Sequence, residues 1–226
     1  MIEQVNFSTV EDAAAALAKD LAAGLRRALN DRGRAALAVS GGITPTLVYP
    51  FLCANALDWD RITVTLTDER WVAADHGDSN EHLTRTRLMV LEAANARLVG
   101  LKTPAEDPAD AVDEVEKRLG TMDWPLDGVF LGMGADGHVA SLFPGRSGVE
   151  SLSGRVVAVP SGDGRGSRMS LTPKALLDAR RIYLVVAGKE KRAAFEAARI
   201  PGPAENLPLR FILGQAQTPV SVYHAP

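Results

Sequence analysis

Residues 126–144 read LDGVFLGMGADGHVASLFP. The apolar run Leu126–Leu131 is typical of a buried strand, and a glycine-rich turn follows it directly. Asp136 and His138 stand in that turn, two positions apart. A turn of this kind at the carboxyl end of a strand can present backbone N–H groups and one exposed side chain to a ligand. The stretch therefore predicts a buried strand that leads into a candidate catalytic turn.

Strands and helices alternate on both sides of this stretch. The predicted strands cover residues 35–39, 61–67, 127–131, 156–159, 182–187 and 219–223, the last of them at an edge of the sheet. The predicted helices cover residues 8–30, a segment that opens at Thr44-Pro45, residues 78–94 and 107–119, a short segment at Thr172-Pro173, and residues 188–199. Ser8 and Glu11 have the spacing of a capping box for the first helix. The alternation predicts the α/β class, with a mostly parallel, doubly wound sheet and helices on both faces.

The composition sets limits on the class of protein. A chain of 226 residues can bury a substantial core, and we expect one domain over residues 1–226. A net charge of −3 argues against a nucleic-acid or membrane partner. The chain starts without the basic and apolar regions of a signal peptide, and a cytoplasmic location is expected. The single Cys53 excludes an internal disulfide, and its apolar, helical surroundings predict a buried structural residue.

Residues 132–137 also match G-x-G-x-x-G, the spacing of a dinucleotide-binding turn. Asp163 lies roughly where a ribose-binding acid would follow. Two features weigh against a nucleotide: Asp136 would place a negative charge beside the pyrophosphate, and the strand lies far into the chain. A nucleotide site remains the minor alternative.

A second glycine turn reads Ser40-Gly41-Gly42-Ile43-Thr44-Pro45 and stands between a predicted strand and a helix. Backbone N–H groups at such a helix start suit a phosphate. The alternative is a purely structural turn in which Ser40 or Thr44 caps the helix. The segment is not a Walker A loop, because the lysine of that motif is absent.

Charged residues follow other predicted strands or open a helix. Asp68, Glu69 and Arg70 come directly after the strand over 61–67, and Arg168 follows a glycine-rich loop over 162–166. Lys189 and Lys191 open the helix over 188–199, where a cation opposes the helix dipole unless an anion compensates it. The cluster at 68–70 could equally be a set of solvated surface charges, and side chains such as Arg168, Lys189 and Lys191 are more often solvated than bound to a ligand.

The remaining motifs limit the chemistry. His76, His82 and His224 are expected to be surface or capping histidines. The chain has no H-E-x-x-H pair and no carboxylate cluster at ligand spacing, so we expect no metal site. It also lacks the G-x-S-x-G elbow, which argues against a covalent serine hydrolase.

Taken together and in order, these motifs resemble the 6-phosphogluconolactonase family over nearly the whole chain. The residues that carry the resemblance are Ser40-Gly41-Gly42, Thr44-Pro45, Asp68-Glu69-Arg70-Trp71-Val72, Ser79-Asn80, Leu131–Gly134, Asp136–His138, Ala140–Pro144, Arg168–Thr172 and Gly188–Lys191. The resemblance implies a modified doubly wound fold shared with glucosamine-6-phosphate deaminases and no metal or organic cofactor. It also implies hydrolysis of 6-phosphoglucono-1,5-lactone to 6-phosphogluconate in the oxidative pentose phosphate pathway.

The resemblance further implies a role for each site residue. His138 would be the general base that takes a proton from the attacking water, and Asp136 would orient or polarise the site. Substrate binding falls to backbone and side-chain groups of Ser40, Gly41, Gly42, Thr44, Asp68, Arg70, Gly134, Arg168 and Lys191. The expected partner is a phosphosugar lactone, and the chain would be a monomer or a weak homodimer.

Two other functions remain open at this point. A sugar-phosphate isomerase or deaminase on the same fold needs additional acids and bases, because it moves a proton between carbons. The Asp-Glu-Arg-Trp stretch at 68–71 favours the lactonase, since the deaminases carry Asp-Glu-Tyr there. A non-catalytic sugar-phosphate sensor would keep the phosphate turn but would not need His138.

Overall fold

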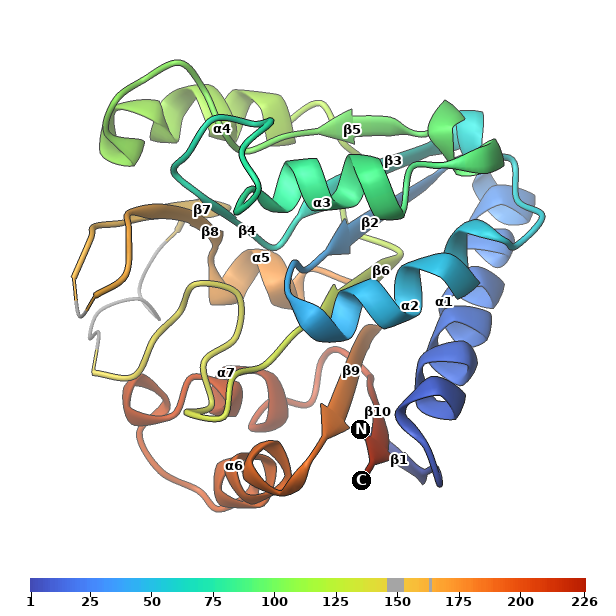
Figure 1. The fold of residues 1–226 in the computed structure, drawn as a ribbon, viewed down its shortest axis with the longest axis vertical. Helices are drawn as coiled ribbons and strands as arrows, with labels where there is room; N and C mark the ends of the chain where they lie inside the picture. Colours follow the sequence, from blue (N-terminus) through green and yellow to red (C-terminus); the bar gives the residue numbers. More distant parts are fainter. Residues whose placement is uncertain (146–152, 163) are drawn as a thin grey trace.

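The computed structural model describes residues 1–145, 153–162 and 164–226 (Figure 1). The strands are β1 (Ile2–Asn6), β2 (Ala35–Val39), β3 (Ile62–Leu66), β4 (Asp68–Arg70), β5 (Arg97–Val99), β6 (Gly128–Leu131), β7 (Val156–Val159), β8 (Arg168–Leu171), β9 (Ile182–Ala187) and β10 (Val220–Ala225). The α-helices are α1 (Val10–Arg32), α2 (Ile43–Cys53), α3 (Asn80–Arg87), α4 (Val112–Leu119), α5 (Pro173–Leu177), α6 (Lys189–Arg199) and α7 (Leu209–Leu213). Short 3-10 helices cover Trp59–Arg61, Leu91–Asn95, Pro108–Ala111 and Ala204–Asn206.

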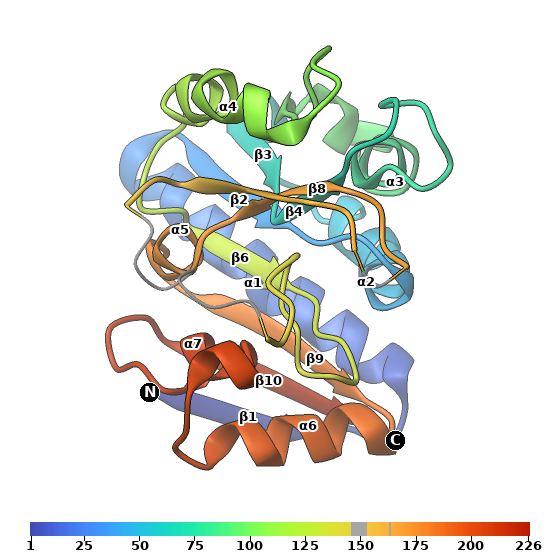
Figure 2. The ribbon, with the colours of Figure 1, turned by 90° about the vertical axis from the view of Figure 1, so that its left-hand side faces the viewer.

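Seven strands form one sheet in the order β1-β10-β9-β6-β2-β3-β5, and every pairing in it is parallel. Helix α1 packs along β10, β9 and β2, and α2 packs on α1. Figure 2 shows α1 behind the strands and α5 and α7 in front of them. The α/β prediction with helices on both faces is therefore confirmed.

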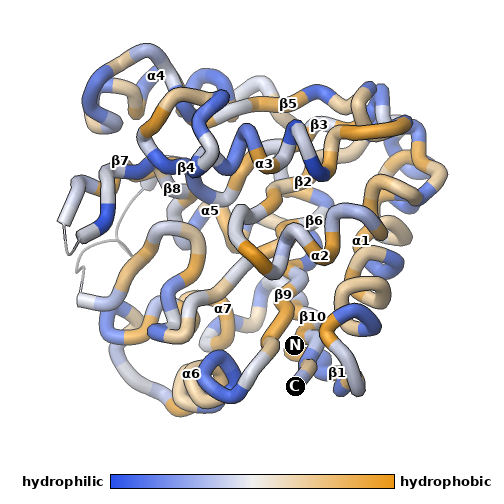
Figure 3. The backbone as a smooth tube through the Cα atoms, viewed as in Figure 1, coloured by the Kyte–Doolittle hydropathy of each residue, from blue (hydrophilic) through white to orange (hydrophobic). Residues whose placement is uncertain are grey.

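The burial of each element follows from its sequence. Strands β2 and β6 are buried along their whole length, as a central parallel strand covered on both faces must be. Figure 3 shows the hydrophobic colour along β9 and hydrophilic segments on α6. Helix α1 turns an alanine and leucine face to the sheet, with Leu17, Leu21 and Leu25 fully buried.

A second, three-stranded antiparallel sheet has the order β4-β8-β7. The sequence analysis assigned β7 to the main sheet and did not predict β4 or β8. The segments at 68–70 and 168–171 are short and open on charged residues, so neither has the apolar run that identified the other strands. This small sheet pairs Asp68 with Ser170 and Arg70 with Arg168.

Several element predictions need correction. Strand β10 lies between β1 and β9, so it is not an edge strand; β1, which was not predicted, forms that edge. The first helix is capped by Thr9, whose hydroxyl accepts from the Asp12 N–H, rather than by Ser8. The third helix ends at Arg87, and residues 91–95 form a separate 3-10 turn.

His224 is also misassigned as a surface histidine. Its side chain is 2 % exposed, packs edge-on against Phe195 and contacts Gln4 on β1 through Nε2. Cys53, in contrast, is buried at the end of α2 as predicted. Asp163 lies outside the described residues.

No helix in the described part of the chain is both long enough and apolar enough to span a membrane.

Candidate active site

A cavity of about 270 Å³ opens at the carboxyl ends of the central strands. Its walls come from the ends of β2 and β6, the first turns of α2 and α6, and strands β4 and β8. A crevice at the carboxyl ends of parallel strands is where this class of sheet binds ligands. The lining residues are Ser40, Gly41, Gly42, Ile43, Thr44, Pro45, Asp68, Arg70, Asn80, Gly132, Met133, Gly134, His138, Ala140, Arg168 and Lys191.

The turn after β6 holds a carboxylate and an imidazole in contact. Nδ1 of His138 lies 2.6 Å from Oδ1 of Asp136, and the same oxygen accepts the His138 backbone N–H at 3.1 Å. Asp136 is ionised at neutral pH, so we assign the Nδ1 proton to this contact, which leaves Nε2 with its lone pair. Partial burial raises the pKa of the Asp136 carboxyl, but the hydrogen bonds from His138 and the cation of Arg165 outweigh it and hold that pKa below its ordinary value.

Gly134 is part of the geometry of this pair. A Cβ at position 134 would lie 2.2 Å from Nδ1 and Cε1 of His138 and 2.6 Å from Oδ1 of Asp136. The turn is closed by bonds from the Gly134 N–H to the His138 carbonyl and from the Gly137 N–H to the Gly134 carbonyl. Gly137 has φ +78°, a conformation that favours glycine. Gly134 therefore leaves the space that the imidazole and the carboxylate occupy, and Gly137 allows the backbone conformation of the turn.

The turn before α2 leaves its N–H groups without a side-chain cap. The N-cap residue is Gly42, at φ 102°, and among the described residues no side chain accepts from the first turn of α2. Neither Ser40 nor Thr44 caps the helix, so the capping role that the structural alternative gave to one of them is wrong. The first turn also lacks an acidic residue, so the positive end of the helix faces the cavity without compensation.

Ser40 holds the turn in place. Its hydroxyl lies 2.8 Å from the Thr67 hydroxyl and accepts the Gly132 N–H at 2.9 Å, and its carbonyl accepts the Tyr49 hydroxyl. Ser40 therefore links the ends of β2, β3 and β6, and its exposed fraction is only 3 %.

Lys191 reaches the same place from α6. Its Nζ lies 3.3 Å from the Thr44 hydroxyl, and burial lowers the pKa of the ammonium group. Helix α6 begins after Gly188, which provides no side-chain cap. Lys189, one of the two candidate cations, is exposed and does not line the cavity.

Two arginines and a carboxylate form the opposite wall. Arg168 lies 3.8 Å from Asp68 as an ion pair, and its guanidinium makes no hydrogen bond to any described residue. Desolvation lowers the pKa of Arg168, and Asp68 partly offsets this. The Asp68 carboxylate also accepts from Ser141 at 2.5 Å and from Asn80 at 3.4 Å.

Glu69 and Asn80 organise this wall, and the sequence analysis gave neither a role. The buried Glu69 carboxylate accepts four hydrogen bonds, from the Ser79 hydroxyl and from the N–H groups of Arg70, Asn80 and Glu81, so it anchors the start of α3. Burial raises the pKa of Glu69 despite those bonds. Asn80 lines the cavity, and a Cβ on Gly41 would lie 1.8 Å from its Oδ1.

The structure brings together all the residues to which the resemblance gave a role in the site. Asp136 is the exception, because it does not line the cavity. It contacts His138, which does line the cavity, through Nδ1. The lining residues that the sequence analysis did not assign are Ile43, Pro45, Asn80, Gly132, Met133 and Ala140. Most of them belong to the sequence motifs quoted above, so their position within those motifs was the signal that could have identified them as lining residues.

The nucleotide alternative lacks its structural context. A dinucleotide turn leads directly into a helix, whereas residues 132–145 form bridges and turns without a helix. Within residues 1–145, 153–162 and 164–226, no three His, Cys, Asp or Glu side chains are grouped so that they could hold a metal ion.

The comparisons with known proteins agree with this architecture. The family model of glucosamine-6-phosphate isomerases/6-phosphogluconolactonase matches residues 8–220, so the chain belongs to this family. A 6-phosphogluconolactonase of Mesorhizobium japonicum is 41% identical over 218 residues, which cover 94% of this chain and 91% of the relative. A 6-phosphogluconolactonase of Pseudomonas aeruginosa is 36% identical over 225 residues, which cover 97% of this chain and 93% of the relative.

Solved structures show the same fold. A 6-phosphogluconolactonase from Shewanella baltica superposes with a TM-score of 0.97 at 34% identity and covers 100% of this chain and 98% of its own. A monomeric glucosamine-6-phosphate deaminase superposes with a TM-score of 0.80 at 20% identity over 98% of this chain and 97% of its own, which shows a shared fold alone.

Proposed function

We propose that this protein hydrolyses 6-phosphoglucono-1,5-lactone to 6-phosphogluconate. The observation that carries the proposal is the contact between Asp136 and His138 on the rim of a cavity whose far end is cationic. Relatives that cover nearly the whole chain bear the name 6-phosphogluconolactonase, which supports the same substrate.

The phosphate of the substrate would bind between the starts of α2 and α6. The uncapped N–H groups at Gly42 and Thr44 and the ammonium group of Lys191 converge there. Charge-assisted hydrogen bonds of this kind are roughly twice as strong as neutral ones, so they can hold the sugar ring in one position. Positioning of this kind lowers the barrier of the reaction at the other end of the molecule.

The lactone carbonyl would then lie toward His138. Nε2 takes a proton from a water molecule as its oxygen bonds to C1, and the carbonyl electrons move onto oxygen. The resulting imidazolium is stabilised by the Asp136 carboxylate. When the tetrahedral intermediate collapses, the bond from C1 to the ring oxygen breaks, and the imidazolium returns its proton to that oxygen. General-base catalysis contributes roughly 10²–10⁴ in rate.

Arg70 and Arg168 would hold oxygens of the sugar or of the developing carboxylate. Arg168 has no hydrogen bond to the described residues, so its planar fork is available to a ligand oxygen. Gly134 would lie close to the ring, and Ser40 and Gly41 would contribute mainly by fixing the shape of the phosphate turn.

A deaminase is the second candidate, and the state of Asp68 argues against it. An isomerase needs a base that moves a proton between carbons, and such a group must reach the proton that it takes. In this chain the Asp68 carboxylate accepts from Ser141 and Asn80 and pairs with Arg168. Asp68 is better placed to orient Arg168 than to act as a base.

The test is hydrolysis of freshly prepared 6-phosphoglucono-1,5-lactone, followed as proton release above the spontaneous rate. Wild-type protein should accelerate the reaction, and His138→Ala should fold, bind 6-phosphogluconate and lose most of the activity. His82→Ala, at a half-exposed position of α3 that does not line the cavity, is the control. Ammonia release from glucosamine 6-phosphate in place of lactone hydrolysis would support the deaminase.

We further propose that residues 1–226 form one domain, supported by an apolar core to which both ends of the chain contribute. A cytoplasmic location, action without a cofactor and a monomeric or weakly dimeric state stay predictions.

A further inference from the structure

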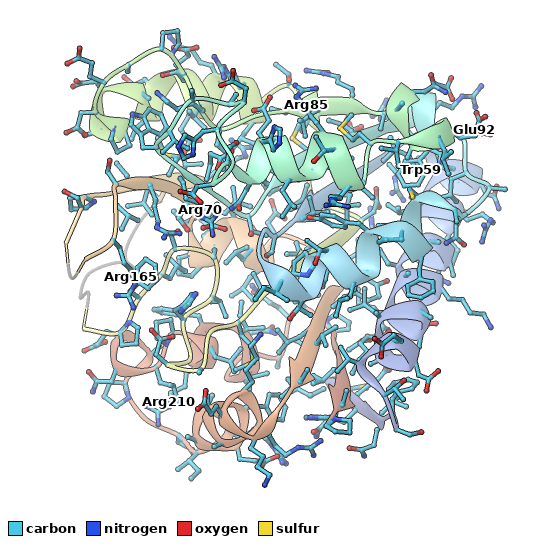
Figure 4. The ribbon with its side chains drawn as sticks, viewed as in Figure 1. Trp59, Arg70, Arg85, Glu92, Arg165 and Arg210 are labelled. Carbon is cyan, nitrogen blue, oxygen red and sulfur yellow. The ribbon has the colours of Figure 1, made fainter. Side chains whose placement is uncertain are left out.

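Arg165 lies beside the Asp136–His138 pair, although it is distant in sequence and no motif points to it. Its NH2 group lies 3.5 Å from Oδ2 of Asp136. Figure 4 shows Arg165 and Arg70 on the same side of the molecule, Arg165 on the segment that leads into β8. Arg165 does not line the cavity, and its side chain contacts residues of the site.

A tight turn brings Arg165 to this place. The Gly162 N–H donates to the Arg165 carbonyl at 3.0 Å, and the Arg165 N–H donates to the Gly162 carbonyl at 2.9 Å. Gly164 has φ +73°, which favours glycine. These two reciprocal bonds fix the backbone position of Arg165 independently of the contacts that its side chain makes.

The two oxygens of Asp136 face different partners. Oδ1 contacts Nδ1 and the backbone N–H of His138, and Oδ2 faces Arg165. Without a partner on Oδ2, the carboxylate could rotate about its side-chain bonds and Oδ1 could leave the imidazole. A cation on the far oxygen therefore opposes the movement that would disorient His138.

The ring of Phe143 supports the same arrangement. The Arg165 guanidinium lies 4.4 Å from the centre of that ring, and the His138 ring centre lies 4.9 Å from it. Phe143 is 6 % exposed, so it gives both groups a fixed surface. The guanidinium of Arg168 lies 5.5 Å from the same ring, and Arg168 in turn pairs with Asp68.

From this geometry we propose that Arg165 is a positioning residue: its guanidinium holds the Asp136 carboxylate in contact with His138 and packs on the Phe143 ring, which also contacts the imidazole. The inference rests on the proposed lactonase function and adds a residue that its motifs do not contain. Arg165 also carries the charge that helps to keep Asp136 ionised.

The test compares Arg165→Gln, which removes the charge at similar size, with Arg165→Lys, which keeps it. Arg155→Gln is a matched control. Arg155 pairs with Glu116 at 3.8 Å, stacks over Trp124 at 5.1 Å and has the same 41 % side-chain exposure as Arg165. Like Arg165, it does not line the cavity, but it contacts neither Asp136 nor His138.

Two measurements follow each variant: lactone kinetics against pH, and the pH titration of the Asp136 carboxyl carbon by NMR. For Arg165→Gln we expect kcat to fall about three- to tenfold with KM within about twofold, since a half-exposed ion pair is a modest interaction. We also expect Asp136 to titrate at higher pH, because a neighbouring cation has been removed. Arg165→Lys should restore the titration and part of kcat, because lysine keeps the charge without the planar fork.

Wild-type kcat together with an unchanged Asp136 titration in Arg165→Gln would overturn the proposal. So would an equal loss in Arg155→Gln, because it would show a general effect on folding. If wild-type protein fails to hydrolyse the lactone, the proposed function fails, and the NMR titration still decides whether Arg165 holds Asp136.

Discussion

The carboxylate of Asp136 and the imidazole of His138 lie 2.6 Å apart on the turn over residues 134–138, and both lie close to the Cα of Gly134. The pair depends on local backbone geometry, since the same carboxylate oxygen also accepts the backbone N–H of His138. The closed turn therefore brings the two residues together, and Arg165 on the other carboxylate oxygen adds a contact from outside the turn.

Asp136→Asn should lower kcat about ten- to hundredfold and leave KM nearly unchanged. Asparagine has similar size and can still accept from the imidazole, but it cannot stabilise the imidazolium that forms when His138 takes the proton. Steady-state kinetics of lactone hydrolysis measure this. Asp107→Asn is the control, because Asp107 also accepts the N–H two residues on, from Ala109, far from the cavity. A variant with wild-type kcat would remove Asp136 from the mechanism.

Lys191→Ala should raise KM about ten- to hundredfold with a smaller change in kcat. Loss of one hydrogen bond to a charged group costs about 1.5–3 kcal/mol, and a phosphate remote from the lactone carbonyl is bound alike in the ground and transition states. Arg168→Ala should act in the same direction.

Lys189→Ala is the matched control for Lys191→Ala. It removes the same side chain two positions earlier in the first turn of α6, where the lysine is exposed. Equal KM values for the two variants would contradict the assignment of Lys191 as the phosphate ligand. Binding of inorganic phosphate to both variants, measured by calorimetry, provides the comparison without turnover.

Long apolar segments made much of the fold predictable. Strands β2, β7 and β9 have the predicted bounds, because each is an uninterrupted run of apolar residues that begins directly after an arginine. The order of the strands in the sheet was not predictable in the same way. Strand β1 has four exposed residues out of five, so nothing in its composition indicates that it pairs outside β10.

In the site, too, contacts within one short segment could be predicted from the sequence, whereas contacts between distant segments could not. Asp136 and His138 are neighbours in sequence, so their contact follows from one turn. The approach of Arg168 to Asp68 depends on the pairing of β4 with β8, two strands that the sequence pattern does not indicate. Arg165 is placed by the turn that precedes β8, so its contact with Asp136 could not be foreseen without that sheet.

Gly134→Ala should abolish most of the activity, with kcat reduced by about a hundredfold or more. The new Cβ would overlap the imidazole and the Asp136 carboxylate, and both are fixed to the backbone of the turn, so the pair must move. Gly77→Ala is the control, since no atom lies within 4 Å of a Cβ there and its φ is not in the left-handed region. Kinetics and thermal unfolding of both variants test this. Full activity in Gly134→Ala would show that the turn does not hold the pair as described.

The buried His224 should make the protein less stable as the pH falls below about 6.5. Burial, followed by the nearby Arg192, lowers the pKa of its imidazole from 6.5, and Nδ1 is buried without a partner among the described residues. The folded state therefore resists a proton that the unfolded chain accepts, so unfolding takes up a proton in the window below 6.5 and above the folded value. Stability rises with pH across that window, by at most about 1.4 kcal/mol per pH unit for one group.

His224→Gln should remove this dependence. Glutamine can still bond to Gln4 but loses the ring contact with Phe195, so the variant should be less stable than wild type at pH 8. Because glutamine does not titrate, this difference in the free energy of unfolding should shrink toward pH 5. Urea unfolding at pH 5, 6, 7 and 8 measures the free energy of unfolding for both proteins. His82→Gln, made on the half-exposed histidine of α3, controls for the loss of an imidazole in general. A constant difference between wild type and His224→Gln from pH 8 to pH 5 would show that His224 takes up its proton equally in the folded and unfolded states.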